Sequence, residues 1–448
     1  MPISVRLTIL VVVLSEHTIL FMIPTFVSFM VAGFMPDIVD RSQISSKSGY
    51  IEGIAGTLGF VGCLFWGAIS DKIGRKPALI IVLSGMIVAS LGFGLSPSYE
   101  VCLVWRGVAG IMAGVVPLSK SLIQDISDES NIAILYSYLG MGYGFASILG
   151  PFIGGFLSRP TNYFPVLSDT VFDHFPYFLP MICHSTIASI AIIMVILYIK
   201  PKNSSTPTAV KTEHKSTDLL KNKNYLMGLA IFILVGVIQF GYRIIMACWV
   251  KVPKEDGGLG FENEMVVGIM NSLSGIIVTG YHFFAVPYMS KKLGVIKSGI
   301  FIVVKLIPVV VIVSFCNGLF DVWGNWVFWA VIIVANGLCI ALSTACISFI
   351  SIGISNSVDI EILGLATGIT QSIIACVRGV SIAGFGIIFA AAQGWEIGFP
   401  FDLHFPFFFL ALILVLIYTM MQFGLSKEIE TRKKKKDIEI PLIEKSKI

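Results

Sequence analysis

Charged residues interrupt several apolar stretches that are long enough to span a bilayer, and these residues are the best placed to do chemistry. They are Glu16, Arg106, Lys120, Arg243, Lys305 and Arg378. A charge at the centre of a bilayer costs at least ~2.5 to 3.5 kcal/mol, so such side chains generally face a polar cavity and have a function. For Lys120 and Arg243, which lie near the ends of their stretches, extension of the side chain to the membrane surface is the alternative.

Glu16 is the only acidic residue that we place well inside one of these stretches. At ~1.5 Å per helical residue it lies about 13 to 15 Å from the nearer helix end, close to the membrane midplane. A carboxylate in such a place can bind and release a proton as neighbouring charges move. We predict that Glu16, Arg106 and His184 form a proton-coupling group. For His184, a structural hydrogen-bonding role is the alternative.

Tyrosine, amide and arginine side chains are scattered through the apolar stretches, a mixture typical of small-molecule sites. We predict a substrate cavity lined by Tyr138, Tyr143, Gln239, Asn271, Gln371 and Arg378. Packing between helices is the alternative for each of these residues.

A group of charged residues and glycines follows the second apolar stretch, in the sequence WGAISDKIGRKP of residues 66–77. A carboxylate there can pair with an arginine or cap the N-terminus of a facing helix, and the glycines permit close approach of helix ends. We predict a conformational latch formed by Gly67, Asp71, Gly74, Arg75, Lys76 and Asp125. Solvated charges that anchor the loop are the alternative.

The fifth apolar stretch has an unusually small-faced segment that contains Gly150, Pro151, Gly154 and Gly155. Small residues allow two helices to pack closely, and a proline bends the helix that contains it. We predict that this segment packs tightly against a neighbour and restricts leak, and plain helix packing without a transport role is the alternative.

These residues need a membrane-spanning scaffold to position them. Of the 448 residues, 56% are hydrophobic and 13% are charged, whereas soluble domains have about 25% charged residues. A span needs roughly 20 apolar residues, and about twelve such stretches occur, at approximately 7–33, 50–69, 78–96, 99–122, 132–157, 177–199, 225–249, 264–287, 298–317, 325–349, 362–392 and 403–425. Backbone polar groups must be paired in lipid, so these stretches must be helices. We predict an all-α polytopic membrane protein, which excludes a soluble enzyme.

Lysine and arginine are distributed unevenly between the two sides of the predicted helices. Alternate loops and both termini contain 21 of them, and the opposite loops contain five. By the positive-inside rule both termini are cytoplasmic, in either the plasma membrane or the vacuolar membrane. The basic run at residues 432–436 is expected to bind anionic lipid.

A sequence repeat divides the chain into two halves. The sequence SDKIG at residues 70–74 and the sequence SKKLG at residues 290–294 follow the second and eighth stretches, so both halves have the same orientation. The polar segment between them resembles a flexible linker. We predict a six-helix half at 1–200, a cytoplasmic linker at 201–224, a second six-helix half at 225–425 and a basic cytoplasmic tail at 426–448.

The motifs at residues 66–77, 106–114 and 137–155 resemble three signatures of major facilitator superfamily transporters, the last being typical of the proton-coupled drug antiporter group. The form of the first and last motifs is similar to that of the zinc-induced facilitator-like family. The resemblance implies two parallel-repeat halves with a substrate site between them near mid-membrane.

The composition and motifs also limit the functions to consider. No P-loop occurs, the net charge is only +4, and the eight cysteines are never spaced as CxxC. We therefore expect no ATP-driven pumping, no nucleic acid, no metal site and no cofactor. The resemblance implies a monomeric secondary transporter, not an enzyme, that exchanges a drug-like, cationic or metal-chelate solute for protons. A uniporter, a proton symporter and a non-transporting membrane sensor are the alternatives.

Overall fold

The structure is a computed structural model that describes residues 2–36, 42–127, 132–200, 219, 221–358, 363–395 and 397–425. Within these ranges the chain forms helices and no strand, and twelve helices are long and apolar enough to cross a membrane. The prediction of an all-α polytopic membrane protein is therefore confirmed. The basic run and most of the predicted linker lie outside the described residues, so the predicted domain limits stay predictions.

Six spans form the first half of the molecule. They are α1 (Ile3–Phe34), α2 (Ser42–Ile73), α3 (Arg75–Gly94), α4 (Tyr99–Ile111) continued by α5 (Val115–Ile126), α6 (Ile132–Phe156) and α8 (Phe178–Tyr198). Between α6 and α8 lie three short helices, η1 (Pro160–Asn162), η2 (Pro165–Leu167) and α7 (Val171–His174).

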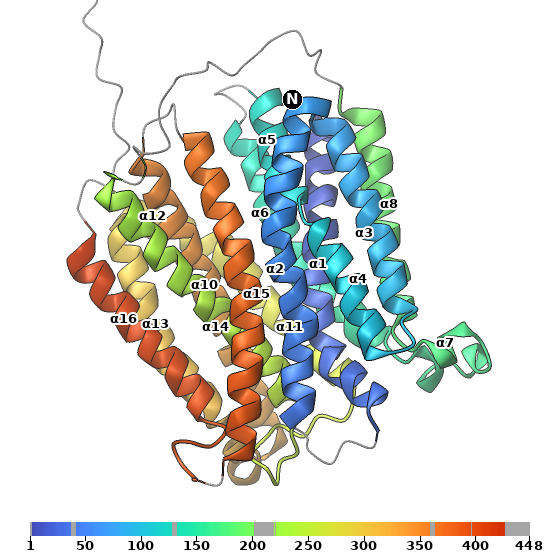
Figure 1. The fold of residues 1–448 in the computed structure, drawn as a ribbon. Helices are drawn as coiled ribbons and strands as arrows, with labels where there is room; N and C mark the ends of the chain where they lie inside the picture. The colour runs from blue at the N-terminus through green and yellow to red at the C-terminus, as the bar shows by residue number, and fades with distance from the viewer. Residues whose placement is uncertain are drawn as a thin grey trace, which may run out of the picture.

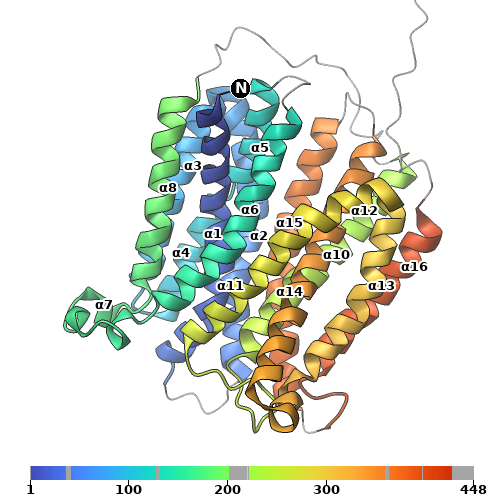
Figure 2. The ribbon, with the colours of Figure 1, turned by 180° about the vertical axis from the view of Figure 1, so that it is seen from behind.

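The second half also has six spans. They are α10 (Lys223–Trp249), α11 (Glu264–Gly280) continued by the π-helix η3 (Tyr281–Ala285) and by α12 (Val286–Leu293), α13 (Val295–Ser314), α14 (Leu319–Asn356) preceded by η4 (Cys316–Gly318), α15 (Leu363–Gly394) and α16 (Phe405–Gly424). Figures 1 and 2 show the two halves side by side, with the N-terminus at one end of the bundle. We call that end the inner side and the opposite end the outer side.

The sequence repeat has a direct structural counterpart in the turns that follow the second and eighth spans. Gly74 joins α2 to α3 with a φ of 93°, and Gly294 joins α12 to α13 with a φ of 79°. Residues that have a side chain rarely adopt a positive φ of this size, so glycine is required at the corresponding place in each half. Both turns lie on the inner side, as a parallel repeat requires.

The two halves contact each other closely in the outer part of the bundle. A Cβ atom on Gly53 of α2 would lie 2.8 Å from the Cβ of Ala383 on α15, and one on Gly155 of α6 would lie 2.6 Å from the Cα of Gly268 on α11. Contacts this short exclude a side chain, so the backbones approach closely at both places. These two crossings close the outer side of the molecule.

Candidate functional site

A cavity of about 550 Å³ lies between the two halves. This volume is in the range typical of small-molecule sites. The cavity extends from mid-depth towards the inner side, where Ser137, Pro287 and Ile347 line it. The outer crossings close the other end of the cavity, so the molecule has an inward-facing arrangement.

Most residues predicted to line a substrate cavity do line this one. They are Tyr143, Gln239, Gln371 and Arg378, which Glu16 joins. Gln239 donates a hydrogen bond from Nε2 to Oη of Tyr143 over 3.5 Å, which links α10 to α6. The structure therefore brings the predicted polar residues of both halves to one surface.

Two predicted cavity residues lie elsewhere. Asn271 lines a smaller cavity of about 40 Å³ and accepts a hydrogen bond from Nδ2 of Asn336 over 3.2 Å. Tyr138 packs against the apolar cluster of Ile9, Ile123 and Leu135. It lies five residues before Tyr143, which on a helix is about 140° around the axis, so the two side chains cannot share a face. The structure thus corrects the placement of Tyr138.

Glu16 lies where the fourth span is interrupted. The helix breaks between α4 and α5, which frees the carbonyl of Ile111 and the first amide groups of α5. The indole Nε1 of Trp66 donates to the oxygen of Ile111 over 2.9 Å, and Oε2 of Glu16 accepts a hydrogen bond from the backbone nitrogen of Val116 over 2.8 Å. The Glu16 carboxylate therefore caps the positive N-terminus of α5.

Two arginines of the second half share the central cavity with Glu16. Arg378 of α15 lines it, and it also lines a smaller cavity together with Glu16. Arg243 of α10 also lines the cavity, donates from Nη1 to the oxygen of Leu20 over 3.3 Å and lies 4.5 Å from the centre of the Phe21 ring. Arg243 therefore faces the interior and does not extend to the membrane surface.

Arg106 pairs with an acid that the sequence reasoning missed. Its Nη2 lies 3.2 Å from Oε2 of Glu52, and its Nε donates to the oxygen of Ile51 over 3.3 Å. Both side chains of this ion pair are 5% exposed. The helix α2 begins at Ser42, eight residues before the predicted span, so Glu52 lies within the helix rather than at its end. Glu16 is therefore not the only acid inside a span.

His184 lies within the first half and outside the central cavity. It is fully buried, its Nδ1 lies 2.7 Å from Oγ of Ser90 and its Nε2 lies 3.0 Å from the oxygen of Ser15. Both ring nitrogens thus connect neighbouring helices, which favours the structural alternative stated for this residue. A role in proton coupling stays a prediction.

Three of the predicted latch residues, Asp71, Arg75 and Asp125, meet on the inner side. Arg75 lies 2.6 Å from Asp71 and 3.5 Å from Asp125 of α5, so it connects the turn after α2 with the end of the fourth span. Lys76 donates from Nζ to the oxygen of Ile196 over 2.7 Å. Gly67 does not have the expected close contact, since a Cβ there would meet no atom within 4 Å. Within the described residues, the partners of Arg75 all belong to the first half.

The glycines of the fifth span face two different neighbours. A Cβ on Gly150 would lie 2.7 Å from the oxygen of Thr18, and one on Gly154 would lie 2.6 Å from the oxygen of Met22, both on α1 of the same half. Gly155 instead faces Gly268 of the other half, whose own Cβ position is 2.7 Å from the oxygen of Pro151. Of Gly150, Gly154 and Gly155, Gly155 is therefore the one that faces the second half.

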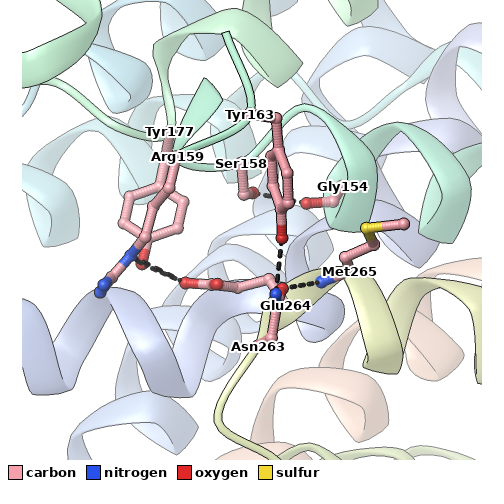
Figure 3. Close-up of polar contacts among 8 residues, drawn as sticks. All are labelled: Gly154, Ser158, Arg159, Tyr163, Tyr177, Asn263, Glu264 and Met265. Carbon is pink, nitrogen blue, oxygen red and sulfur yellow. Dashed lines mark hydrogen bonds and ion pairs between the residues drawn. The ribbon is translucent and has the colours of Figure 1, made fainter. Parts of the chain in front are cut away.

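A polar cluster beside this crossing also joins the halves (Figure 3). Glu264, the first residue of α11, has its Oε1 3.0 Å from Nε of Arg159 and 2.9 Å from Oη of Tyr177, which donates to it. Asn263 donates from Nδ2 to Oη of Tyr163 over 2.5 Å. Glu264 is nearly buried, so this cluster forms a polar seal on the outer side.

No group of three or more His, Cys, Asp or Glu suited to a metal ion occurs in the part of the chain that the structure describes. The polar side chains that line the central cavity supply one carboxylate, two arginines, two histidines, one thiol, and hydroxyl and amide groups. His17 and His282 line the same cavity, and Nε2 of His282 lies 2.8 Å from Oγ1 of Thr344. Such a set can bind a charged organic solute and exchange protons.

Comparison with known proteins places this architecture in a family. A protein-family model described as Major Facilitator Superfamily matches residues 17–380. The chain is 25% identical over 397 residues to "Protein ZINC INDUCED FACILITATOR 1" of Arabidopsis thaliana, covering 80% of each protein. It is 24% identical over 389 residues to "Efflux pump azaK" of Aspergillus niger, covering 85% of this chain and 80% of that protein.

The fold leads to the same result. The solved structure described as a D-xylose-proton symporter matches with a TM-score of 0.76 at 14% identity, over 95% of this chain and 98% of that one. The predicted resemblance is confirmed, since the family model spans most of the chain and the relatives include a zinc-induced facilitator. The protein is an integral multi-pass membrane protein that belongs to the Major Facilitator Superfamily of transporters.

Proposed function

We propose that this transporter is a proton-coupled antiporter that moves a small organic solute out of the cytoplasm. The observation that carries the proposal is the position of Glu16. Its carboxylate lines the central cavity, where a solute would bind, and is held by the N-terminus of α5. A carboxylate in this place can bind a proton in one phase of the transport cycle and a solute in the other.

Competition for Glu16 explains why exchange is favoured over cotransport. A cationic group of the solute gains most beside the charged carboxylate, so its binding favours release of the proton. A purely anionic solute would have the opposite effect, because it would bind better when Glu16 is protonated. Antiport therefore requires that the solute present positive charge to Glu16.

The two arginines that line the cavity add a second requirement, which is that the solute also present negative charge. Arg243 and Arg378 both line the cavity, so its charged walls have two fixed positive groups for one carboxylate. A simple cation would be repelled by the arginines, whereas an anionic group of the same solute can pair with them in a bidentate way. Among the predicted classes of drug-like, cationic and metal-chelate solutes, we therefore favour a metal chelate that has groups of both signs.

Alternating access supplies the direction of transport. With the inner side cytoplasmic, as the distribution of Lys and Arg predicts, the cavity takes up solute from the cytoplasm. Opening of the outer crossings then exposes it to the other side of the membrane. Where that other side is the more acidic one, proton entry drives solute exit.

The test uses proteoliposomes with an acidic lumen and three probes. These are the zinc–histidine chelate with radioactive zinc, the anionic dye 8-methoxypyrene-1,3,6-trisulfonate and the cationic dye rhodamine 6G. We expect gradient-driven uptake of the chelate above that of either dye, with alkalinisation of the lumen. The variant Glu16→Gln should lose gradient-driven accumulation. The exchange of labelled for unlabelled chelate that remains should need a higher chelate concentration, because the neutral side chain no longer pairs with the solute.

The matched control is Glu100→Gln, since Glu100 is an exposed acid at the start of α4. It should transport like the parent protein. Chelate uptake that does not depend on the pH gradient would indicate a uniporter. Chelate uptake accompanied by proton entry into the lumen would indicate a symporter. A properly inserted protein that transports none of the probes would favour the non-transporting sensor. Each of these results contradicts the proposal.

A further inference from the structure

A second, smaller cavity adjoins the central one at Glu16. It has a volume of about 40 Å³, enough for a few ordered water molecules. Glu16, Leu20, Ala113 and Arg378 line both cavities. Glu16 therefore stands between the central cavity and a small polar chamber in the first half of the molecule.

Glu52 lies on the wall of this chamber, and one of its two carboxylate oxygens has no hydrogen-bond partner among the described residues. Its Oε2 is paired with Arg106, whereas its Oε1 is buried and has no hydrogen-bond partner among the described residues. An unsatisfied buried oxygen costs free energy, and a protein generally retains such an arrangement only where something binds. The chamber beside this oxygen is large enough for water.

We propose that Glu52 is a second proton-binding site, which exchanges a proton with Glu16 through water in the chamber and with the outer side when α15 separates from α2. This inference rests on the proposed antiport function and extends it. It assigns to Glu52 the step by which protons enter from outside, and to Glu16 the step that couples them to the solute.

The wall of the chamber explains how the outer side reaches Glu52. All of its lining residues belong to the first half except Arg378 of α15. At this level α15 lies directly on α2, and a Cβ on Gly56 would lie 3.1 Å from the carbonyl carbon of Arg378. An outward-open state must part these helices, which removes Arg378 and opens the chamber. The same motion that exposes the solute site therefore exposes Glu52.

The charged groups that face Glu52 come from four helices and allow a balanced transfer. They are Arg106 on α4, Glu16 on α1 and Arg378 on α15, while α3 contributes the neutral Met86. A fourth helix, α10, adds Arg243, whose charge also acts on Glu52. A hydronium ion from the outer side gives its proton to Oε1 of Glu52 and becomes water. After closure the proton passes through water to Glu16, which restores the charged Glu52–Arg106 pair. Glu16 then releases it to the inner side.

The test measures carboxyl protonation directly in protein without solute. Infrared spectroscopy of the protein in lipid follows the C=O stretch of protonated carboxyl groups between pH 9 and pH 5. We expect part of the pH-dependent band to disappear in Glu52→Gln and a different part to disappear in Glu16→Gln. The spectroscopic control is Glu262→Gln, because Glu262 is exposed and lines neither cavity. Its pH-dependent band should equal that of the parent.

An identical pH-dependent band in the parent protein and in Glu52→Gln would overturn the inference. If Glu52→Gln does not fold, Glu52→Asp keeps a carboxylate, and the midpoint or frequency of the band must shift in that variant. The two proposals fail separately. If Glu52→Gln leaves the pH-dependent infrared band unchanged while the parent protein shows gradient-driven transport, only the role of Glu52 is refuted. A parent protein without gradient-driven transport refutes the antiport function.

Discussion

Breaking the polar seal formed by Arg159, Tyr177 and Glu264 should shift the protein towards its outward-open state. The substitution Glu264→Gln keeps the size of the side chain and an acceptor oxygen for Tyr177. It removes the negative charge that lies 3.0 Å from Nε of Arg159. These contacts join the two halves and exist only when the outer side is closed, so their loss raises the free energy of the inward-facing state alone.

The size of the effect follows from the exposure of the two side chains. Glu264 is 6% exposed and Arg159 is 40% exposed, so the ion pair is partly screened by solvent. Buried hydrogen bonds to charged groups contribute about 1.5 to 3 kcal/mol, and fully exposed ion pairs about 1 kcal/mol or less. An intermediate value of about 1 to 2 kcal/mol corresponds to a shift of roughly 5- to 30-fold in the equilibrium between the two states.

The assay measures the distance between spin labels on the outer loops of the two halves. Val166 in η2 and Ile397 after α15 are 85% and 72% exposed, and cysteines there accept labels once the partly exposed Cys63, Cys183 and Cys376 are replaced by serine. The population with a long distance should grow in Glu264→Gln.

The exposed neighbour Glu262 supplies the matched control, and Glu262→Gln should leave the distance distribution unchanged. The double variant Arg159→Gln with Glu264→Gln should shift the distribution little more than either single change, because the two residues form one interaction. Equal distributions in the parent and Glu264→Gln would refute the reasoning, and so would additive shifts in the double variant.

Three further predictions follow from the site. Gly155→Leu should favour the outward-open state at normal thermal stability, because a side chain at 155 strikes Gly268 of the other half. Gly154→Leu should instead lower the melting temperature, because a side chain at 154 strikes α1 inside its own half. Equal melting temperatures of the two variants would contradict this difference. Asp71→Asn should slow exchange without loss of expression, since Asp71 is 66% exposed and its ion pair contributes only ~0.3–0.5 kcal/mol to folding; exchange at the parent rate would show a solvated loop charge. Arg243→Gln should weaken chelate binding, with a rise in the half-saturating concentration, and an unchanged value would remove Arg243 from the solute site.

Much of the architecture could be predicted because it depends on residues that are adjacent in the chain. The length and apolarity of each stretch predict a helix, since a backbone in lipid must pair its own polar groups. The glycine that ends each of the two matching turns is likewise a local requirement, met at Gly74 and Gly294 by a positive φ. The predicted position of Glu16 at a central cavity also agrees with the structure. A charged side chain inside an apolar span generally faces a polar cavity, because exposing it to lipid costs free energy.

Only the tertiary structure decided which of these side chains meet. Arg106 was expected to act near Glu16, but its partner is Glu52, whose helix extends further than the hydropathy pattern indicates. Gly154 and Gly155 are adjacent in sequence, yet one faces its own half and the other faces the opposite half. Successive residues on a helix are separated by about 100° around its axis. The partner of each side chain therefore depends on how helices rotate and cross, and those angles are set by contacts between residues far apart in the chain.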